Sequence, residues 1–424
     1  MDLSKENSLL LSTHELRIGM YVHIELGWMD HPFALNKFRI ANDKQLQDIQ
    51  SLQLKQIRVF PSKSDEGLFN SSLLDALSIT SQPQKIDHSN HDNGLILALQ
   101  RASLARCDKS FSEASAQWQN VMANVDANPL EARITCNTMM KAFVQETAHE
   151  QDTHIRLLSE VAGESFVLHA LNVTVISILL ARSLGLSESE IEDVGMAALL
   201  HDVGKQKLPE RVKLGVNLSP AQDVLARSHV SQSVDICRAM GLGAGVLNII
   251  SQHHEFADGS GYPNGLTAGQ TTRGAQIVSL VNIYDNLSNP NNSMLSLTPH
   301  EAMSMLFAQR KHQFEHHTLQ AFVKLMGVYP PGSVVQLNDD RYAVVVSANA
   351  SRPNKPAVLV HDSAVPADQA LVLNLDSSPD VSIRRSLHAK HLPPASLDYL
   401  SPRKRICYFF ERSYGSDNVH GAIA

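Results

Sequence analysis

The sequence is poor in cysteine, with only four in 424 residues: Cys107, Cys136, Cys237 and Cys407. No two of them form a C-x-x-C pair, so the spacing supports neither a disulfide framework nor a zinc ribbon. Cys237 lies within a predicted helix between two histidines, His229 and His253, and is expected to be a packed core residue.

Excess basic charge is also missing. The chain has 36 Lys and Arg against 43 Asp and Glu, a net charge of −7. A nucleic-acid binder needs a surplus of Lys and Arg to neutralise phosphates, so the composition argues against that class. An enzyme acting on a nucleotide stays compatible, because bound metal ions can supply positive charge locally.

No uninterrupted apolar run approaches the ~18 residues that span a bilayer. The densest stretch, Val173 to Ala181, stops at Arg182. The first seven residues lack the charged-then-apolar order of a signal peptide. We therefore expect no membrane span and a cytoplasmic location.

The length allows two or three domains of about 100–200 residues each. Residues 16–24 alternate apolar and polar, which predicts a strand, and further strands are expected at 33–40 and 55–60 around a helix at 44–52. These elements predict a small α+β domain over residues 1–64. Residues 65–128 are predicted to be a linker, rich in Ser, Asp, Asn and Gln at first, followed by helices.

Residues 129–328 have helical periodicity, and the stretch from 150 onward is predicted to be nearly all helix. Ser187 and Glu190 form a capping box, and Ser219-Pro220 opens a helix that should run past His229 to Gly241. From residue 329 the period changes to two, which predicts a small β extension over 329–412, and residues 413–424 are expected to be a mobile tail. The predicted fold class is multidomain, with an all-α helical bundle core.

Histidine is abundant, with 20 residues, and several have suggestive neighbours. His201-Asp202 ends an apolar helix and is followed by Gly204-Lys205. A buried carboxylate is costly unless it is paired or binds a metal. In isolation such a pair is more often a capped helix end, and His169, on a dense apolar helix, would more often be a core residue.

His253 and His254 are adjacent, and neighbouring helical residues point about 100° apart. They can share one site only at a helix end, where the glycine-rich string Asp258-Gly-Ser-Gly-Tyr-Pro263 begins. The pair therefore indicates a site at that helix end.

Together these residues resemble the HD-GYP family of bacterial cyclic dinucleotide phosphodiesterases, over about residues 130–330. The order of the histidines, Lys205 and the HHExxDGxGYP string all match, and residues 14–61 look like the uncharacterised domain that often precedes HD-GYP. The strands after Pro330 also look like an extension found in some members. The resemblance implies an HD-type bundle that hydrolyses cyclic di-GMP to linear pGpG or GMP.

The resemblance also implies roles for individual residues. It implies two divalent ions, and a ligand set without thiolate suits iron or manganese at least as well as zinc. The implied metal ligands are His169, His201, Asp202, His229, His253, His254 and Asn282. Asp202 and Lys205 would be catalytic, with Lys205 placing positive charge on the phosphate. The implied substrate-binding residues are Asp258, Gly259, Gly261, Tyr262 and Pro263, with Tyr262 as a stacking surface for a base. A diguanylate cyclase or another signalling protein could bind through the same loop.

Three positions depart from the family pattern. Ser165 stands where members with a third metal have Glu, and Asn282 stands where an Asp ligand is expected. Asn289-Pro-Asn-Asn-Ser replaces an Arg/Lys-rich segment that would be a substrate clamp. These departures keep two alternatives open: a receptor that binds the nucleotide or a partner without turnover, and an HD-type phosphohydrolase acting on another nucleotide. The oligomeric state stays open as well.

Other motifs carry less chemistry. His316-His317 is expected to be a solvent-facing pair on an amphipathic helix, and Trp28 and His31 are expected to pack in a core or turn.

Overall fold

The computed structural model describes residues 9–24, 37–52, 54, 56–65, 68, 90–148, 153–159, 165–213, 215, 218–292 and 295–412. Trp28, His31, part of the strand expected at 33–40 and the tail 413–424 lie outside these residues. The chain divides into two compact units, Met1–His88 and Ser89–Ala424.

Within its described residues, the first unit is an antiparallel sheet of four strands with one α-helix. The strand order is β1-β4-β2-β3. Its elements are β1 (Leu9–Ser12), η1 (Thr13–Glu15), β2 (Tyr21–His23), β3 (Lys37–Arg39), α1 (Asp43–Ser51), β4 (Gln56–Val59) and η2 (Pro61–Lys63). The α+β composition agrees with the prediction.

The strand predicted over residues 16–24 is wrong for most of its length. Only Tyr21–His23 is a strand, because Gly19 has a φ of +92°, which breaks an extended chain. A Cβ at Gly19 would lie 2.5 Å from Asp65 Oδ2. The alternating pattern there marks a turn packed on a core that includes Val22, Ile40 and Val59.

The second unit contains a helical core wrapped around α5 (Ser165–Ser183), which is buried over most of its length. The other helices are α3 (Asn90–Asn124), α4 (Pro129–Glu146), α6 (Glu188–Leu200), η3 (Val203–Lys207), α7 (Glu210–Lys213), α8 (Pro220–Arg227), α9 (His229–Ala239), α10 (Ala244–Gln252), α11 (Arg273–Ser288), α12 (Pro299–Ala308), η5 (Lys311–Gln313) and α13 (His316–Met326). By length and composition α5 could cross a membrane, with a mean hydropathy of 1.6 over its best window, but 78% of that window is buried inside the protein. A core helix has the same composition.

One predicted helix is two helices. The helix opened by the Ser219 cap ends at Arg227, and α9 begins at His229. Between them the Ser228 hydroxyl donates to the Leu225 carbonyl at 2.6 Å, so a side chain competes for a backbone acceptor at this point. The break puts His229 at the start of a helix instead of in its middle.

The second unit also contains a sheet of seven strands, all paired antiparallel. The strands are β5 (Thr153–Leu157), β6 (Val334–Leu337), β7 (Tyr342–Ser347), β8 (Ala357–Val360), β9 (Val372–Asn374), β10 (Ile383–Leu387) and β11 (Tyr408–Arg412), accompanied by η6 (Ala367–Gln369), η7 (Ala389–His391) and α14 (Pro394–Leu400). The main path is β10-β6-β7-β5-β11, and β8 and β9 extend from β7.

The stretch from residue 150, predicted to be nearly all helix, therefore also contains a strand, β5. This strand pairs with β11, Tyr408 lying opposite Leu157, a partner that local periodicity cannot reveal. One hydrophobic core contains Trp118 of α3, Leu171 of α5, Val334 of β6 and Tyr408 of β11. The expected boundaries at 128/129 and 328/329 thus fall inside one compact unit.

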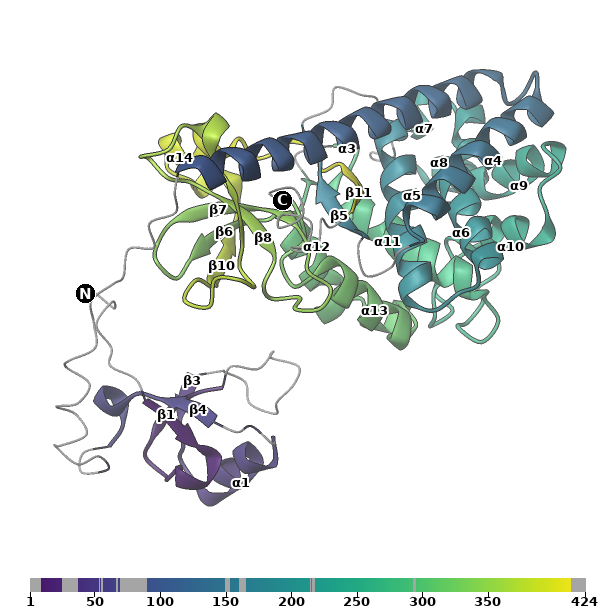
Figure 1. Cartoon of the computed structure of the whole chain (residues 1–424). Coiled ribbons are helices and arrows are strands. Elements are labelled where there is room, and N and C mark those ends of the chain that lie inside the picture. Colours follow the sequence, from purple (N-terminus) through teal and green to yellow (C-terminus); the bar gives the residue numbers. More distant parts are fainter. Residues whose placement is uncertain are drawn as a thin grey trace. The chain divides into compact units, whose positions relative to one another are not determined.

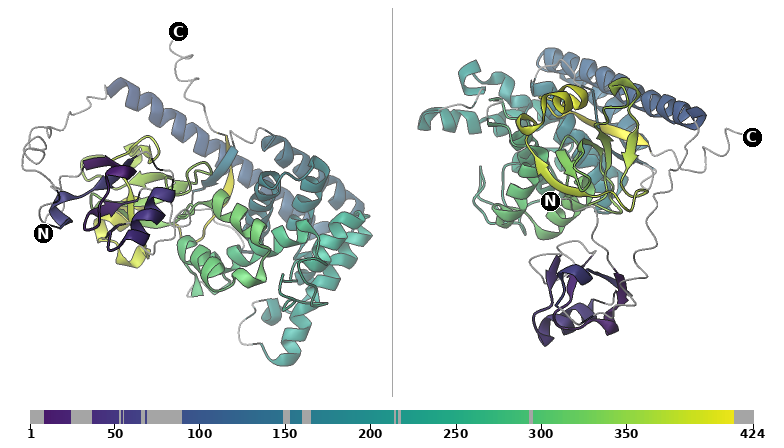
Figure 2. Two further views of the ribbon diagram at one scale, coloured as in Figure 1. Left: turned by 90° about the horizontal axis from the view of Figure 1, so that it is seen from below. Right: turned by 90° about the vertical axis from the view of Figure 1, so that its left-hand side faces the viewer.

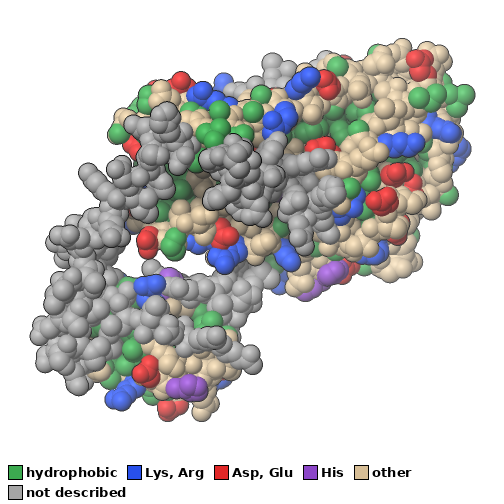
Figure 3. Space-filling view, viewed as in Figure 1, with side chains coloured by type: hydrophobic (Ala, Val, Ile, Leu, Met, Phe, Trp, Pro, Cys, Tyr) green, Lys and Arg blue, Asp and Glu red, His purple; other side chains and the backbone are tan. Residues whose placement is uncertain are grey.

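Helix α3 runs along the length of this unit, from the strands to the helical end (Figures 1 and 2). It is fixed to the strands by reciprocal hydrogen bonds between Gln100 and the Val372 backbone, and by Cys107 Sγ donating to the Phe410 carbonyl. On the face seen in Figure 3, side chains of both charges are interspersed over the described surface.

Candidate metal centre

Two groups of metal-ligating side chains share one carboxylate. The first group is His169, His201 and Asp202, and the second is Asp202, His229, His253 and His254; within each group the ligand atoms all lie within 4.8 Å of one another. The site thus combines five histidines and one aspartate from α5, the ends of α6 and α10, and the start of α9. His201 and His253 have no solvent exposure, and Asp202 is 2% exposed.

Three of the histidines are oriented by carbonyls at helix C-termini. His201 Nδ1 lies 2.7 Å from the Ala198 carbonyl, His229 Nδ1 2.6 Å from that of Ala226, and His253 Nδ1 2.6 Å from that of Ile250. The last carbonyls of a helix lack partners inside the helix, so they accept from the imidazole three residues later. This contact places the proton on Nδ1 and turns the Nε2 lone pair into the site.

His169 is oriented differently. Its Nδ1 donates to Asp285 Oδ2 at 2.7 Å, across 116 residues of sequence. Asp285 lies on α11 and is fully buried. A carboxylate behind a ligating histidine fixes the tautomer and raises the basicity of the opposite nitrogen.

The short distances between facing Nε2 atoms show whether a cation fits between the histidines. His169 and His201 bring these atoms to 3.2 Å, and His229 and His253 to 3.4 Å. With Nδ1 protonated in all four, two lone pairs face each other and cannot form a hydrogen bond. Buried Asp202 Oδ1 also lacks a hydrogen-bond donor while lying 3.2 Å from His229 Nε2. These donors fit a divalent metal ion.

Protonation supports the same fit. Burial lowers the pKa of His253 and His254 well below the ordinary histidine value, with further lowering from neighbouring histidines, and lowers the pKa of His229. Burial by itself would raise the pKa of Asp202, but Lys205 and the surrounding histidines hold it well below its usual range. Neutral imidazoles and an ionised carboxylate are the forms that bind metal.

The string after Asp202 brings the two ligand groups together. A Cβ on Gly204 would lie 2.3 Å from the His229 carbonyl oxygen and 2.5 Å from the Ser233 nitrogen, so only glycine lets η3 approach α9 this closely. Lys205 Nζ lies 2.5 Å from Asp202 Oδ2, which puts a cation at the edge of the cluster.

Two of the departing positions, Ser165 and Asn282, lie on the helices that carry His169 and its partner Asp285. Ser165 is the first residue of α5, four residues before His169. Asn282 is buried on α11, and its Oδ1 accepts from Asn286 Nδ2 at 2.6 Å. Metal binding by Asn282 stays a prediction.

The glycine-rich loop contacts the cluster through one side chain. Tyr262 stacks on His254 with ring centroids 4.5 Å apart, and the Arg227 guanidinium lies 4.7 Å from the Tyr262 centroid. The protein's own residues therefore already contact this ring, which was expected to be a base-stacking surface.

The remaining loop residues shape the backbone. Asp258 accepts from the Ser260 amide and hydroxyl, Gly259 has a φ of +77°, and Pro263 is exposed. A Cβ at Gly261 would lie 2.4 Å from the His254 carbonyl oxygen, so the loop returns against the ligand pair. Their substrate-binding role stays a prediction.

The sequence did not predict a role at this site for Asn172, Arg227, Glu255 or Asp285. Glu255, buried inside the string that was recognised, accepts from the amides of Asn264 and Leu266 and holds the loop closed. Its position next to His254 was a usable signal. The others depend on contacts between distant segments.

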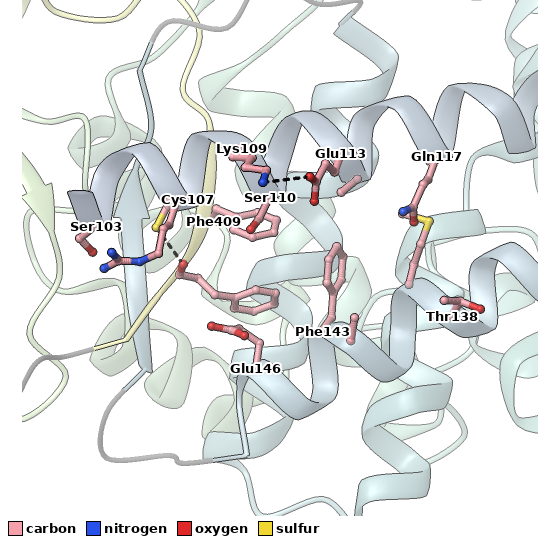
Figure 4. A pocket seen from close by; sticks show the side chains of 15 residues that line it. Ser103, Cys107, Lys109, Ser110, Glu113, Gln117, Thr138, Phe143, Glu146 and Phe409 are labelled. Carbon is pink, nitrogen blue, oxygen red and sulfur yellow. Dashed lines mark hydrogen bonds and ion pairs between the residues drawn. The ribbon is translucent and has the colours of Figure 1, made fainter. Parts of the chain in front are cut away.

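Two expectations away from the centre agree with the structure. His316 and His317 are exposed on α13, and Cys237 is buried. A cavity of about 510 Å³ lies between α3, α4 and β11, lined by Cys107, Phe143 and Phe409 among others (Figure 4). None of its lining residues belongs to the histidine cluster.

Comparison with known families gives two matches. Residues 145–317 match the HD domain, and residues 9–133 match a domain of unknown function, DUF3391. The helical core is thus of the HD type. The DUF3391 match extends over α3 and into α4, beyond the first compact unit.

Curated relatives include the cyclic di-GMP phosphodiesterase PA4108 of Pseudomonas aeruginosa, 26% identical over 365 residues, covering 84% of this chain and 87% of that protein. The response regulator RpfG of Xanthomonas campestris, named a cyclic di-GMP phosphodiesterase, is 33% identical over 34% of this chain and 39% of its own length. The 3'3'-cGAMP-specific phosphodiesterase 2 of Vibrio cholerae is 28% identical over 42% of this chain and 35% of its own length. Among solved structures, the HD-GYP protein Bd1817 from Bdellovibrio bacteriovorus matches 74% of this chain and 98% of its own at 17% identity, with a TM-score of 0.41.

Proposed function

The chain has an HD domain at residues 145–317, preceded by a DUF3391 match, and we propose that it is a metal-dependent phosphodiesterase that hydrolyses cyclic di-GMP. The observation that carries the proposal is the convergence of five imidazoles on Asp202, four of them turned inward by a partner on Nδ1. The similarity to a named cyclic di-GMP phosphodiesterase over 84% of the chain supports the choice of substrate.

The ligand set suits two divalent ions, with iron or manganese as the proposed metals, because all its donors are nitrogen or oxygen. His169 and His201 would hold one ion and His229, His253 and His254 the other, with Asp202 common to both groups. Asn282 would complete the first group as a neutral ligand. When bound, the ions supply positive charge to the phosphoryl oxygens and lower the pKa of the attacking water.

The chain's own residues would then hold the phosphodiester. One carboxylate among six ligands leaves most of the charge of two divalent ions uncompensated, which favours an anionic substrate. Lys205 adds a fixed cation beside Asp202. In the proposed reaction, the oxygen of water bonds to phosphorus, the P–O3′ bond breaks, and the proton released from water ends on O3′, so the product is linear pGpG. A second hydrolysis of the same kind would give GMP.

The loop and the cell context complete the proposal. Asp258, Gly259, Gly261, Tyr262 and Pro263 would shape the rim of the substrate pocket, and a diguanylate cyclase or another signalling protein could bind there. A cytoplasmic location is proposed as well, and four free, buried cysteines are compatible with it.

Two alternatives have a specific observation behind them. Asn282 removes a negative charge from the first ligand group, which favours a receptor that binds the nucleotide without turnover. Similarity to a 3'3'-cGAMP-specific enzyme favours a different cyclic dinucleotide as substrate.

The test uses the full chain, purified anaerobically and loaded with Mn²⁺ or Fe²⁺. It is incubated with cyclic di-GMP or 3'3'-cGAMP, and products are separated by chromatography. We expect pGpG or GMP from cyclic di-GMP and none from Asp202→Ala. Asp235→Ala is the matched control, because Asp235 is an exposed aspartate that pairs with Arg238 on its own helix, away from the histidine cluster. Binding without cleavage by the fully metallated protein would establish the receptor instead.

A further inference from the structure

Two asparagines connect the start of β11 to the metal centre. Asn172 Nδ2 donates to Asp285 Oδ1 at 2.8 Å and to the Ile406 carbonyl at 2.8 Å, while its Oδ1 accepts from the Tyr408 amide at 2.9 Å. Asn289 Nδ2 donates to the same two oxygens at 2.9 Å each, and its Oδ1 accepts from the Ile406 amide at 2.8 Å. Two side chains, on α5 and at the end of α11, thus make matching contacts.

These contacts leave Asp285 in one orientation. Oδ1 accepts from both asparagines, and Oδ2 accepts from His169 Nδ1. Asp285 and Asn172 are both fully buried, where an unmatched carboxylate or amide would be costly. The carboxylate is therefore held against His169 by the same amides that hold the Ile406–Tyr408 backbone.

We propose that Asn172 and Asn289 are positioning residues, and that the start of β11 is part of the outer shell of the metal centre. Through Asp285 they fix the ring of His169, so the first ligand group depends on a segment more than 200 residues away in sequence. In the second group, His229 and His253 are instead oriented by carbonyls three residues earlier.

Asn289 belongs to a segment that departs from the family pattern. Asn289 opens the segment where a basic substrate clamp was expected. The Asn289 side chain has no charge to offer a phosphate, and it points inward to Asp285 and Ile406. It therefore supports the proposed metal ligand His169, through Asp285.

Further contacts fix β11 to the rest of the unit, so the support is rigid. The Cys407 carbonyl accepts from the Leu158 amide at 3.0 Å, and Tyr408 Oη lies 3.1 Å from Tyr284 Oη of α11. Outer-shell partners of this kind typically change metal affinity about 10–100-fold when removed.

The test measures metal affinity, and it rests on the metal centre proposed above. Asn172→Ala and Asn289→Ala are compared with wild type by anaerobic titration with Mn²⁺ against a competing chelator, followed by elemental analysis. We expect wild type to bind two ions, and each variant to bind one with unchanged affinity and the other about 10–100-fold more weakly. His169→Ala should lose the same ion, and His229→Ala the other.

Asn338→Ala is the matched control. Asn338 also clamps a distant backbone, donating to the Asp380 carbonyl at 2.8 Å and accepting from the Ser382 amide at 3.0 Å, without contacting the centre. It should keep both affinities. Asn289 is only partly buried, so its variant remains informative if Asn172→Ala folds poorly.

Each outcome decides a different point. Wild type that binds no Mn²⁺ would overturn the metal centre and this inference with it. Variants that bind both ions like wild type would overturn the inference alone. So would equal weakening of both ions together with a lower melting temperature of the metal-free protein, which would mark a purely structural role.

Discussion

The two ligand groups of the proposed metal centre differ in how their histidines are oriented. In the group of His229, His253 and His254, two of the imidazoles are oriented by helix-end carbonyls three residues earlier in the sequence. In the group of His169 and His201, His169 depends on Asp285, and Asp285 on Asn172, Asn289 and the start of β11. Local contacts orient His229 and His253, whereas the orientation of His169 requires segments that are distant in sequence.

The largest effect should come from removing the residue that the two groups share. Asp202→Ala takes a carboxylate from both, so we expect loss of both metals and of turnover. Elemental analysis and product chromatography measure this. A variant that keeps either ion at wild-type affinity would show that Asp202 serves one group only.

Lys205→Ala should lower turnover and leave metal binding by both ligand groups unchanged. We expect a loss of roughly 10²–10³-fold in kcat, the scale for one positioned electrostatic stabiliser, with two metals retained. Metal content is measured alongside kcat. If metal is lost, Lys205 acts by holding Asp202, which it contacts directly.

Glu411→Gln tests how strongly β11, on which the orientation of His169 depends, is attached to the rest of the unit. Glu411 accepts from Ser103 at 2.7 Å and Arg156 at 3.0 Å, and lies 3.1 Å from His154 Nε2, joining β11 to α3 and β5. Breaking this buried pair should cost about 3 kcal/mol of unfolding free energy near pH 7. Denaturant unfolding measures the difference.

The pH dependence of that difference has a definite sign. Burial alone would raise the pKa of Glu411, but His154, Arg156 and Ser103 lower it to about 2. Since the folded pKa lies below the unfolded value of about 4.3, the stabilisation is complete above that value and is lost as pH falls toward 2. The gap between wild type and Glu411→Gln should therefore close below about pH 4; a constant gap would assign the cost to packing.

Asn282→Asp should give the smallest change and strengthen the weaker half. A carboxylate in place of the buried Asn282 amide adds a negative charge that attracts a divalent ion. We expect about tenfold better retention of the first ion on dialysis. Asn286 Nδ2 can donate to the new carboxylate as it does to Asn282. Unchanged retention would mean that residue 282 is not a ligand.

The same contrast explains what the sequence could predict. His201-Asp202, His253-His254 and the glycine string were recognisable because each acts within a few residues of chain. β5 could not be recognised as a strand, since its partner β11 lies about 250 residues away. The role of Asn289 was hidden for the same reason, and a local competition at Ser228 hid the break before His229.

The close approach at Gly204 has a mechanical consequence. At Gly204 the backbones of η3 and α9 are in direct contact, so this contact sets how closely Asp202 and His229 approach each other. The separation of Asp202 and His229 is thus set by backbone packing, whereas the position of His169 is set by side-chain contacts with Asp285 and its partners.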